Sequence, residues 1–115
     1  MLEAQSDLRR RLAAAFPGTE VRTRVPNPRP EELITVWREG GRRLNRLQDQ
    51  PGIGVYCWAG SEARAASMAQ SVADFMQRLR FSDGYEVVEM ESMYSDPDPD
   101  SDAPRWYLSY TLIVH

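Results

Sequence analysis

The sequence has no lysine, one cysteine, one histidine and no long apolar run. A single cysteine, Cys57, cannot form an internal disulfide bond, and its apolar surroundings are typical of a buried, unreactive side chain. Without lysine, and with His115 as the lone histidine, most Schiff-base, nucleophile–base and metal-ligand schemes lack their residues. Motifs for nucleotide binding, serine or zinc hydrolysis and dithiol chemistry are absent too. We therefore expect no enzyme activity and no catalytic, cofactor-binding or metal site.

The apolar stretches around Val55 and Leu112 are too short to span a bilayer, so we expect no membrane association. The first residues lack the apolar region of a secretory signal, and we expect none. A length of 115 residues predicts a single domain over residues 1–115.

The charge is distributed unevenly along the chain. All 14 basic residues are arginine, and the formal net charge is −3. Residues 1–46 carry a net charge of +4, whereas residues 47–115 carry −7. This balance does not suit a nucleic-acid binder, which usually presents a basic stripe. A basic half and an acidic half do suit head-to-tail contact between identical copies, although both could also be solvated surface.

The chain is organised around residues 52–79. Residues 52–59 form a short run rich in β-branched and aromatic side chains, which predicts a strand covered on both faces. Ser61 then suits a helix N-cap. Apolar residues recur every three or four positions after it and predict a helix with one apolar stripe. This stripe comprises Ala65, Met68, Ala69, Val72, Phe75, Met76 and Leu79.

The remaining elements add a helix and five strands. We expect a helix over residues 3–16 and strands over 21–25, 33–38, 42–47, 85–94 and 105–115. Gly40-Gly41 favours a hairpin turn between the strands at 33–38 and 42–47. The predicted order is α-β-β-β-β-α-β-β. Such an order predicts an α+β fold, a mostly antiparallel twisted sheet with two helices packed on one face.

An acidic segment, in which aspartates alternate with proline or serine, precedes the last strand. Its aspartates are Asp96, Asp98, Asp100 and Asp102. The spacing is that of the start of an EF-hand loop, but Ser101 replaces the required glycine and Tyr107 the required glutamate. Loose divalent-ion binding at an oligomer axis and a solvated loop are the other interpretations.

The three tryptophans also differ in expected role. Trp58 follows the apolar run and Trp106 begins the last strand, so we expect both to pack in the core. Trp37 could point outward and serve an interface.

In their order along the chain, these features resemble the tail-terminator (tail-completion) proteins of long-tailed bacteriophages. The resemblance runs over nearly the whole length. It lies in the N-terminal helix, the V-R-T-R-V-P-x-P-x-P run at 21–30, Gly40-Gly41, Asp49 and Pro51 before a strand ending in Trp58-Ala59, Ser61-Glu62-Ala63-x-Ala65, the Pro-Asp loop, and Pro104-Arg105-Trp106. The basic segment 42–46 departs from the family pattern.

The resemblance implies a structural virion protein in the neck region of the tail, assembled in the cytoplasm of the bacterial host. Members of the family are small α+β domains that form homohexameric rings. The ring caps the head-proximal end of the tail tube, stops tube polymerisation and provides the joint to the head connector. The resemblance implies no cofactor. It also implies that DNA passes through the ring without specific binding.

We hypothesise that Arg42, Arg43 and Arg46, with Trp37, contribute to the contact with a neighbouring subunit or the tube. The aspartates of the acidic segment would lie at the lumen or the rim. The alternatives are another neck or head-completion component, which binds the portal, and a monomeric adaptor module that captures a peptide at a sheet edge.

Overall fold

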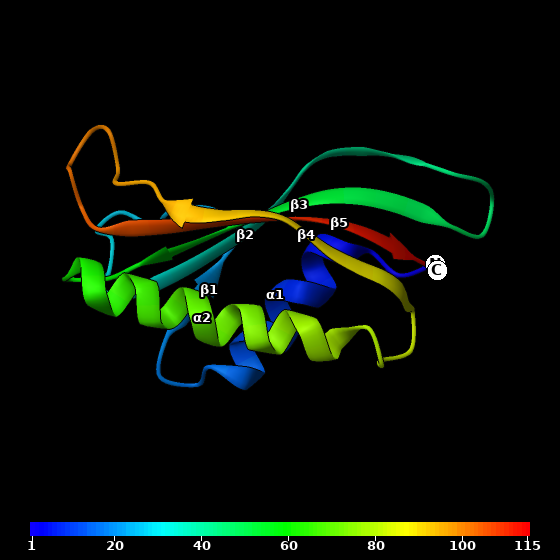
Figure 1. Cartoon of the computed structure of the whole chain (residues 1–115), viewed down its shortest axis with the longest axis horizontal. Helices are drawn as coiled ribbons and strands as arrows, with labels where there is room; N and C mark the ends of the chain where they lie inside the picture. Colours follow the sequence, from blue (N-terminus) through cyan, green and yellow to red (C-terminus); the bar gives the residue numbers. More distant parts are fainter.

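The computed structural model describes all 115 residues, which form two helices and one five-stranded sheet. The elements are α1 (Ala4–Ala15), β1 (Glu20–Arg22), β2 (Leu33–Arg43), β3 (Asp49–Trp58), α2 (Glu62–Leu79), β4 (Tyr85–Ser95) and β5 (Arg105–Val114). The predicted α+β class is confirmed (Figure 1). The order is α-β-β-β-α-β-β, with one strand fewer than expected before the second helix.

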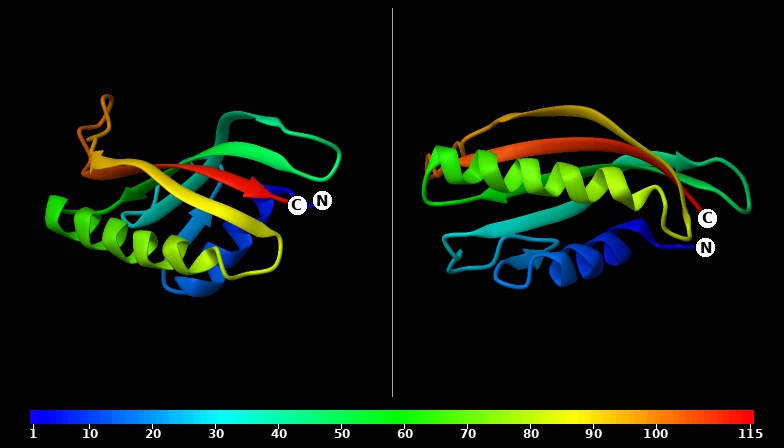
Figure 2. Two further views of the ribbon diagram at one scale, coloured as in Figure 1. Left: turned by 45° about the vertical axis from the view of Figure 1, so that its right-hand side comes forward. Right: turned by 60° about the horizontal axis from the view of Figure 1, so that its bottom comes forward.

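The sheet is mostly antiparallel, with strand order β1-β2-β3-β5-β4. Only the short β1 runs parallel to its neighbour β2. Both helices lie on the same face of the twisted sheet, α1 against β1 and β2, and α2 against β3, β4 and β5 (Figure 2). The two chain ends lie side by side, and the Leu2 amide donates to the His115 carbonyl oxygen at 3.2 Å.

The core fills the space between the helices and the sheet, as the sequence periodicity requires. Alternate residues of the central strands point into it. In β5 these are Leu108, Leu112 and Val114, all fully buried, with Tyr110 almost so. From α2, the predicted stripe contributes every member to the buried core except Phe75, which packs at its edge.

Both helices begin at a capping side chain. The Ser61 hydroxyl accepts a hydrogen bond from the Arg64 amide at 3.1 Å, which confirms the predicted N-cap of α2. In α1 the Glu3 carboxylate accepts from the Ser6 amide at 2.9 Å.

The predicted hairpin turn at Gly40-Gly41 and the separate strand over 42–47 are wrong. Strand β2 continues through both glycines to Arg43, with an irregularity between Arg38 and Gly40. Gly41 has a φ of 93° and packs on the β3 backbone, so these glycines shape a bulged strand and not its end. The chain reverses later, where the amides of Leu44 and Asn45 both donate to the Gln48 carbonyl oxygen.

The strand predicted over 21–25 is also shorter than expected. Only Glu20–Arg22 pairs, and Val21 is its one buried residue. The prolines that begin at Pro26 take the chain away from the sheet, because proline cannot donate to a strand ladder. No helix is both long enough and apolar enough to traverse a bilayer.

Candidate interaction surfaces

The β2–β3 hairpin extends beyond the helices as an arm, which we define as residues 38–51 (Figure 1). The half of β2 that lies in the arm is exposed from Arg38 to Arg43. Arg42 and Arg43 end β2, and Arg46 lies in the turn, so the structure gathers the three predicted arginines near one tip. None of these three takes part in an ion pair. Leu47 at the tip is also 71% exposed.

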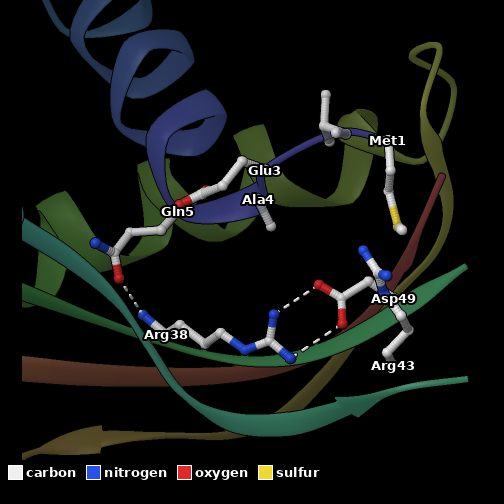
Figure 3. Close-up of a pocket in the computed structure, with 8 residues that line it drawn as sticks. Met1, Glu3, Ala4, Gln5, Arg38, Arg43 and Asp49 are labelled. Carbon is white, nitrogen blue, oxygen red and sulfur yellow. Dashed lines mark hydrogen bonds and ion pairs between the residues drawn. The ribbon is translucent and has the colours of Figure 1, made fainter.

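The root of the arm is held to the body by polar contacts around a small cleft (Figure 3). The Arg38 guanidinium donates to both carboxylate oxygens of Asp49, at 2.6 and 3.0 Å. The Arg38 amide donates to the Gln5 side chain of α1 at 2.7 Å. The hydrogen bonds from Arg38 hold the pKa of the Asp49 carboxyl below its usual value, despite partial burial. The bond to Gln5 joins the arm to α1, whereas the Arg38–Asp49 pair joins the two strands of the arm to each other.

The acidic segment forms a loop between β4 and β5 at the end of the molecule opposite the arm (Figure 1). We call residues 96–104 the acidic loop. Arg105 forms ion pairs with Asp96 at 3.2 Å and Asp98 at 3.7 Å. Asp100 and Asp102 are exposed and have no such partner. No group of three or more His, Cys, Asp or Glu side chains is arranged to hold a metal ion.

Four aromatic side chains form a continuous stripe on the sheet face that no helix covers. The aromatic stripe consists of Trp37 on β2, Tyr56 on β3, Tyr107 on β5 and Tyr94 on β4. Neighbouring ring centroids are 5.2 Å apart for Trp37 and Tyr56, 4.9 Å for Tyr56 and Tyr107, and 5.4 Å for Tyr107 and Tyr94. Tyr94 is 47% exposed, and the other three are half-buried. The stripe therefore leaves part of each of the four rings open to solvent, most of all that of Tyr94.

Carboxylates border the stripe and bind its phenol groups. The Tyr56 hydroxyl donates to Asp96 at 2.9 Å, and the Tyr107 hydroxyl donates to Glu39. Burial and the bond to Asp96 raise the pKa of Tyr56 to about 12. Burial and the bond to Glu39 likewise raise the pKa of Tyr107. Both phenols therefore stay neutral over the physiological range and act as donors.

The surface already holds guanidinium groups of its own chain. The Arg105 guanidinium lies 3.8 Å from the Tyr56 ring centroid and donates to the Asp96 backbone oxygen at 2.8 Å. Arg29 lies over the Trp58 ring at 4.8 Å. This combination of aromatic faces and carboxylates is chemistry that binds arginine.

The tryptophans follow the predictions in part. Trp37 lies on the open face, as expected, stacked on Tyr56. Trp106 packs half-buried against the core. Trp58 is only 4% exposed, but it lies outside the main core, on the opposite face of the sheet. The expectation that this strand is covered on both faces is wrong, because both helices lie on one side.

The two side chains considered for nucleophilic chemistry lie in different environments. Cys57 is fully buried in the core, and burial raises the pKa of its thiol to about 12. His115 is exposed, with a ring nitrogen 3.6 Å from the Glu86 carboxylate.

No protein-family model matches the chain, and no curated protein matches it.

Sequence reasoning identified the arm arginines and the acidic loop but missed the aromatic stripe. The signal for it was partly present. In β3 and β5 the residues between core positions, Tyr56 and Tyr107, must point away from the helices. The register that places Tyr56, Tyr107 and Tyr94 side by side is set by strand pairing.

Proposed function

We propose that this protein is a structural subunit of a homohexameric ring that caps the tail tube of a long-tailed bacteriophage. The ring would form at the head-proximal end of the tube, stop its polymerisation and provide the joint to the head connector. The observation that carries the proposal is the placement of opposite charges. The unpaired arginines of the arm and the acidic loop lie at opposite ends of a molecule 42 Å long.

This placement favours contact between copies. Within one chain the arm and the acidic loop cannot neutralise each other, but arm-to-loop contact between successive chains can. Because the two surfaces differ, the contact is heterologous, and repeated heterologous contacts generate a ring or a filament. The α+β architecture agrees with that expected from the resemblance.

The sheet edges support side-chain contacts over strand addition. One edge is β1, which has only three residues and pairs with β2 only from Leu33 to Thr35. The rest of this edge is β2 itself, which is irregular between Arg38 and Gly40 and ends in two arginines. The other is β4, whose pairing with β5 is interrupted between Tyr85 and Val87 and between Met90 and Ser92. Short and irregular edges resist pairing with another chain. This argues against the alternative of a peptide-capturing adaptor.

The proposed role is tested by tube polymerisation. The purified chain is added to the tail tube protein encoded in the same genome as it assembles, and tube lengths are measured by electron microscopy. Shorter tubes with a ring at one end are expected. Tube lengths unchanged by the chain would contradict the proposal, and binding to the portal instead would favour a head-completion component.

A charge-reversal pair makes the same assay specific. The Arg42→Glu/Arg43→Glu/Arg46→Glu variant should not cap tubes, because its arm repels the carboxylates of a neighbour. The matched control is Arg24→Glu/Arg78→Glu/Arg80→Glu, which changes the net charge equally at exposed arginines outside the arm. The control should cap tubes as the native sequence does.

A further inference from the structure

The aromatic stripe and the acidic loop form one continuous surface. Tyr56 joins them, because its ring belongs to the stripe while its hydroxyl group donates to Asp96 in the loop. No helix covers this face (Figure 2). An exposed apolar patch that is rimmed by polar groups marks an interaction site.

The charges of this surface select a cationic occupant. Five carboxylates border it, from Glu39, Asp96, Asp98, Asp100 and Asp102. Two guanidinium groups oppose them, that of Arg105 over Tyr56 and that of Arg29 over the neighbouring Trp58. A phosphate-bearing partner such as a nucleic acid would be repelled by this excess of negative charge. An arginine-rich partner would gain both carboxylates and aromatic faces, the combination that already holds Arg105 over Tyr56 at 3.8 Å.

The arm has the complementary chemistry. It carries three exposed arginines without ion-pair partners, and the exposed side chain of Leu47 offers an apolar contact at its tip. Its own acidic loop lies at the far end of the long axis, so the arm cannot reach it (Figure 1). A second copy of the chain supplies the required surface.

We propose that the arm of one copy lies on the aromatic stripe of the next copy. Arg42, Arg43 and Arg46 would face the acidic loop of that copy, and Leu47 would contact the exposed ring of Tyr94. This inference rests on the proposed ring, and it assigns the two surfaces that join its subunits.

Complementary charge variants test the contact. The arm variant is Arg42→Glu/Arg43→Glu/Arg46→Glu. The loop variant is Asp100→Arg/Ser101→Arg/Asp102→Asn at three exposed positions, which changes the net charge of residues 96–105 from −3 to +1. Asparagine suits the φ of 58° at position 102. Each variant alone should stay monomeric in native mass spectrometry at a concentration where the native sequence assembles. An equimolar mixture should assemble again, because each kind of arm then meets an oppositely charged loop.

The outcomes separate this contact from the ring itself. Two outcomes would contradict the arm–stripe contact and leave the ring proposal standing. In the first, the native sequence forms rings but the mixture stays monomeric. In the second, either variant alone assembles as the native sequence does. If the native sequence forms no ring, either alone or on tube ends, both proposals fail. Unchanged thermal unfolding of each variant shows that a loss of assembly is not a loss of folding.

Two further measurements address the stripe. Tyr94→Ala should weaken self-association about fivefold, as expected for the loss of one partly exposed apolar contact with Leu47. Met90→Ala is the matched control, because Met90 is similarly exposed on β4 but lies on the helix side, paired with Tyr110. A photo-crosslinker at position 47 should link to residues 92–107 of another copy. Links confined to other segments, or equal effects of the two alanine variants, would overturn the proposal.

Discussion

The carboxylate of Glu39 in β2 accepts a hydrogen bond from the hydroxyl group of Tyr107 in β5, two strands away. The Glu39 side chain crosses β3 at Gly54. A Cβ atom added at Gly54 would lie 2.6 Å from the Glu39 carboxyl carbon. Gly54 therefore allows a side chain from the arm to reach the aromatic stripe within one chain.

Gly54→Ala should displace the Glu39 carboxylate and break this hydrogen bond. The fold should survive at a cost of about 1 kcal/mol, because only the end of a flexible side chain must move. Since Glu39 contributes to the raised pKa of Tyr107, that pKa should fall in the variant, whereas Tyr56 should keep a pKa of about 12. NMR titration of labelled tyrosine measures the pKa values of both tyrosines.

Gly52→Ala is the control, because its Cβ would meet nothing closer than 3.8 Å. An unchanged Tyr107 pKa in Gly54→Ala would contradict this role of Glu39.

Gly40 and Gly41 offer a matched test of the arm. A Cβ at Gly41 would lie 2.0 Å from the Gln50 carbonyl oxygen, and its φ of 93° disfavours other residues, whereas a Cβ at Gly40 meets nothing within 4 Å. Gly41→Ala should therefore distort the arm, cost about 1–3 kcal/mol and abolish tube capping. Gly40→Ala should preserve both the stability of the protein and its ability to cap tubes. Unfolding and tube-length measurements check the pair, and equal behaviour of the two variants would argue against a shaped arm.

Asp49→Asn should loosen the contact between the two strands of the arm. The variant loses the charge that pairs with Arg38, a partly exposed interaction expected to contribute less than about 1 kcal/mol to global stability. Amide hydrogen exchange should therefore accelerate in the arm while α2 and the core strands keep their protection. Uniformly faster exchange would show instead that Asp49 supports the whole fold.

Asp7 should control stability in acid. This buried carboxylate accepts hydrogen bonds from Tyr85 at 2.6 Å and Arg11 at 2.7 Å. Burial alone would raise the pKa of Asp7, but the bonds from Tyr85 and Arg11 outweigh it and lower the pKa below the ordinary 3.8. The stabilisation is therefore complete above pH 3.8 and is lost as the pH falls through the lowered pKa of the folded state.

Asp7→Asn should accordingly cost about 2–3 kcal/mol at neutral pH. The difference in unfolding free energy between the native sequence and the variant should narrow below pH 3.8. Denaturant unfolding at a series of pH values measures this. Asp74→Asn, at an exposed and unpaired position of α2, is the control and should show no such convergence. A difference that is constant with pH would exclude a charged Asp7.

Much of the fold could be predicted from the sequence because local patterns determine it. The period of the apolar stripe and the Ser61 cap define α2, and strict alternation from Leu108 to Val114 defines the inner face of β5. The turn predicted at Gly40 and Gly41 is wrong because pairing between β2 and β3 overrides the local preference of these glycines for a turn. Arg42 lies opposite Gln50 and Arg43 opposite Asp49, which extends the strand.

The positions of the candidate surfaces could be predicted from the sequence only where one segment carries them. The arginines of the arm and the aspartates of the acidic loop are each contiguous in sequence. The stripe comprises one residue from each of four strands, so it depends on registers that no local pattern contains. Its phenol–carboxylate bonds join residues as distant as Glu39 and Tyr107.

The ring is tested most directly by native mass spectrometry of the purified chain over a concentration series, with tail tubes added in a parallel sample. A hexameric species that grows with concentration, or a six-copy ring bound at tube ends, is the expected result. A chain that remains monomeric at every concentration and leaves tube ends uncapped would contradict a tail-terminator function.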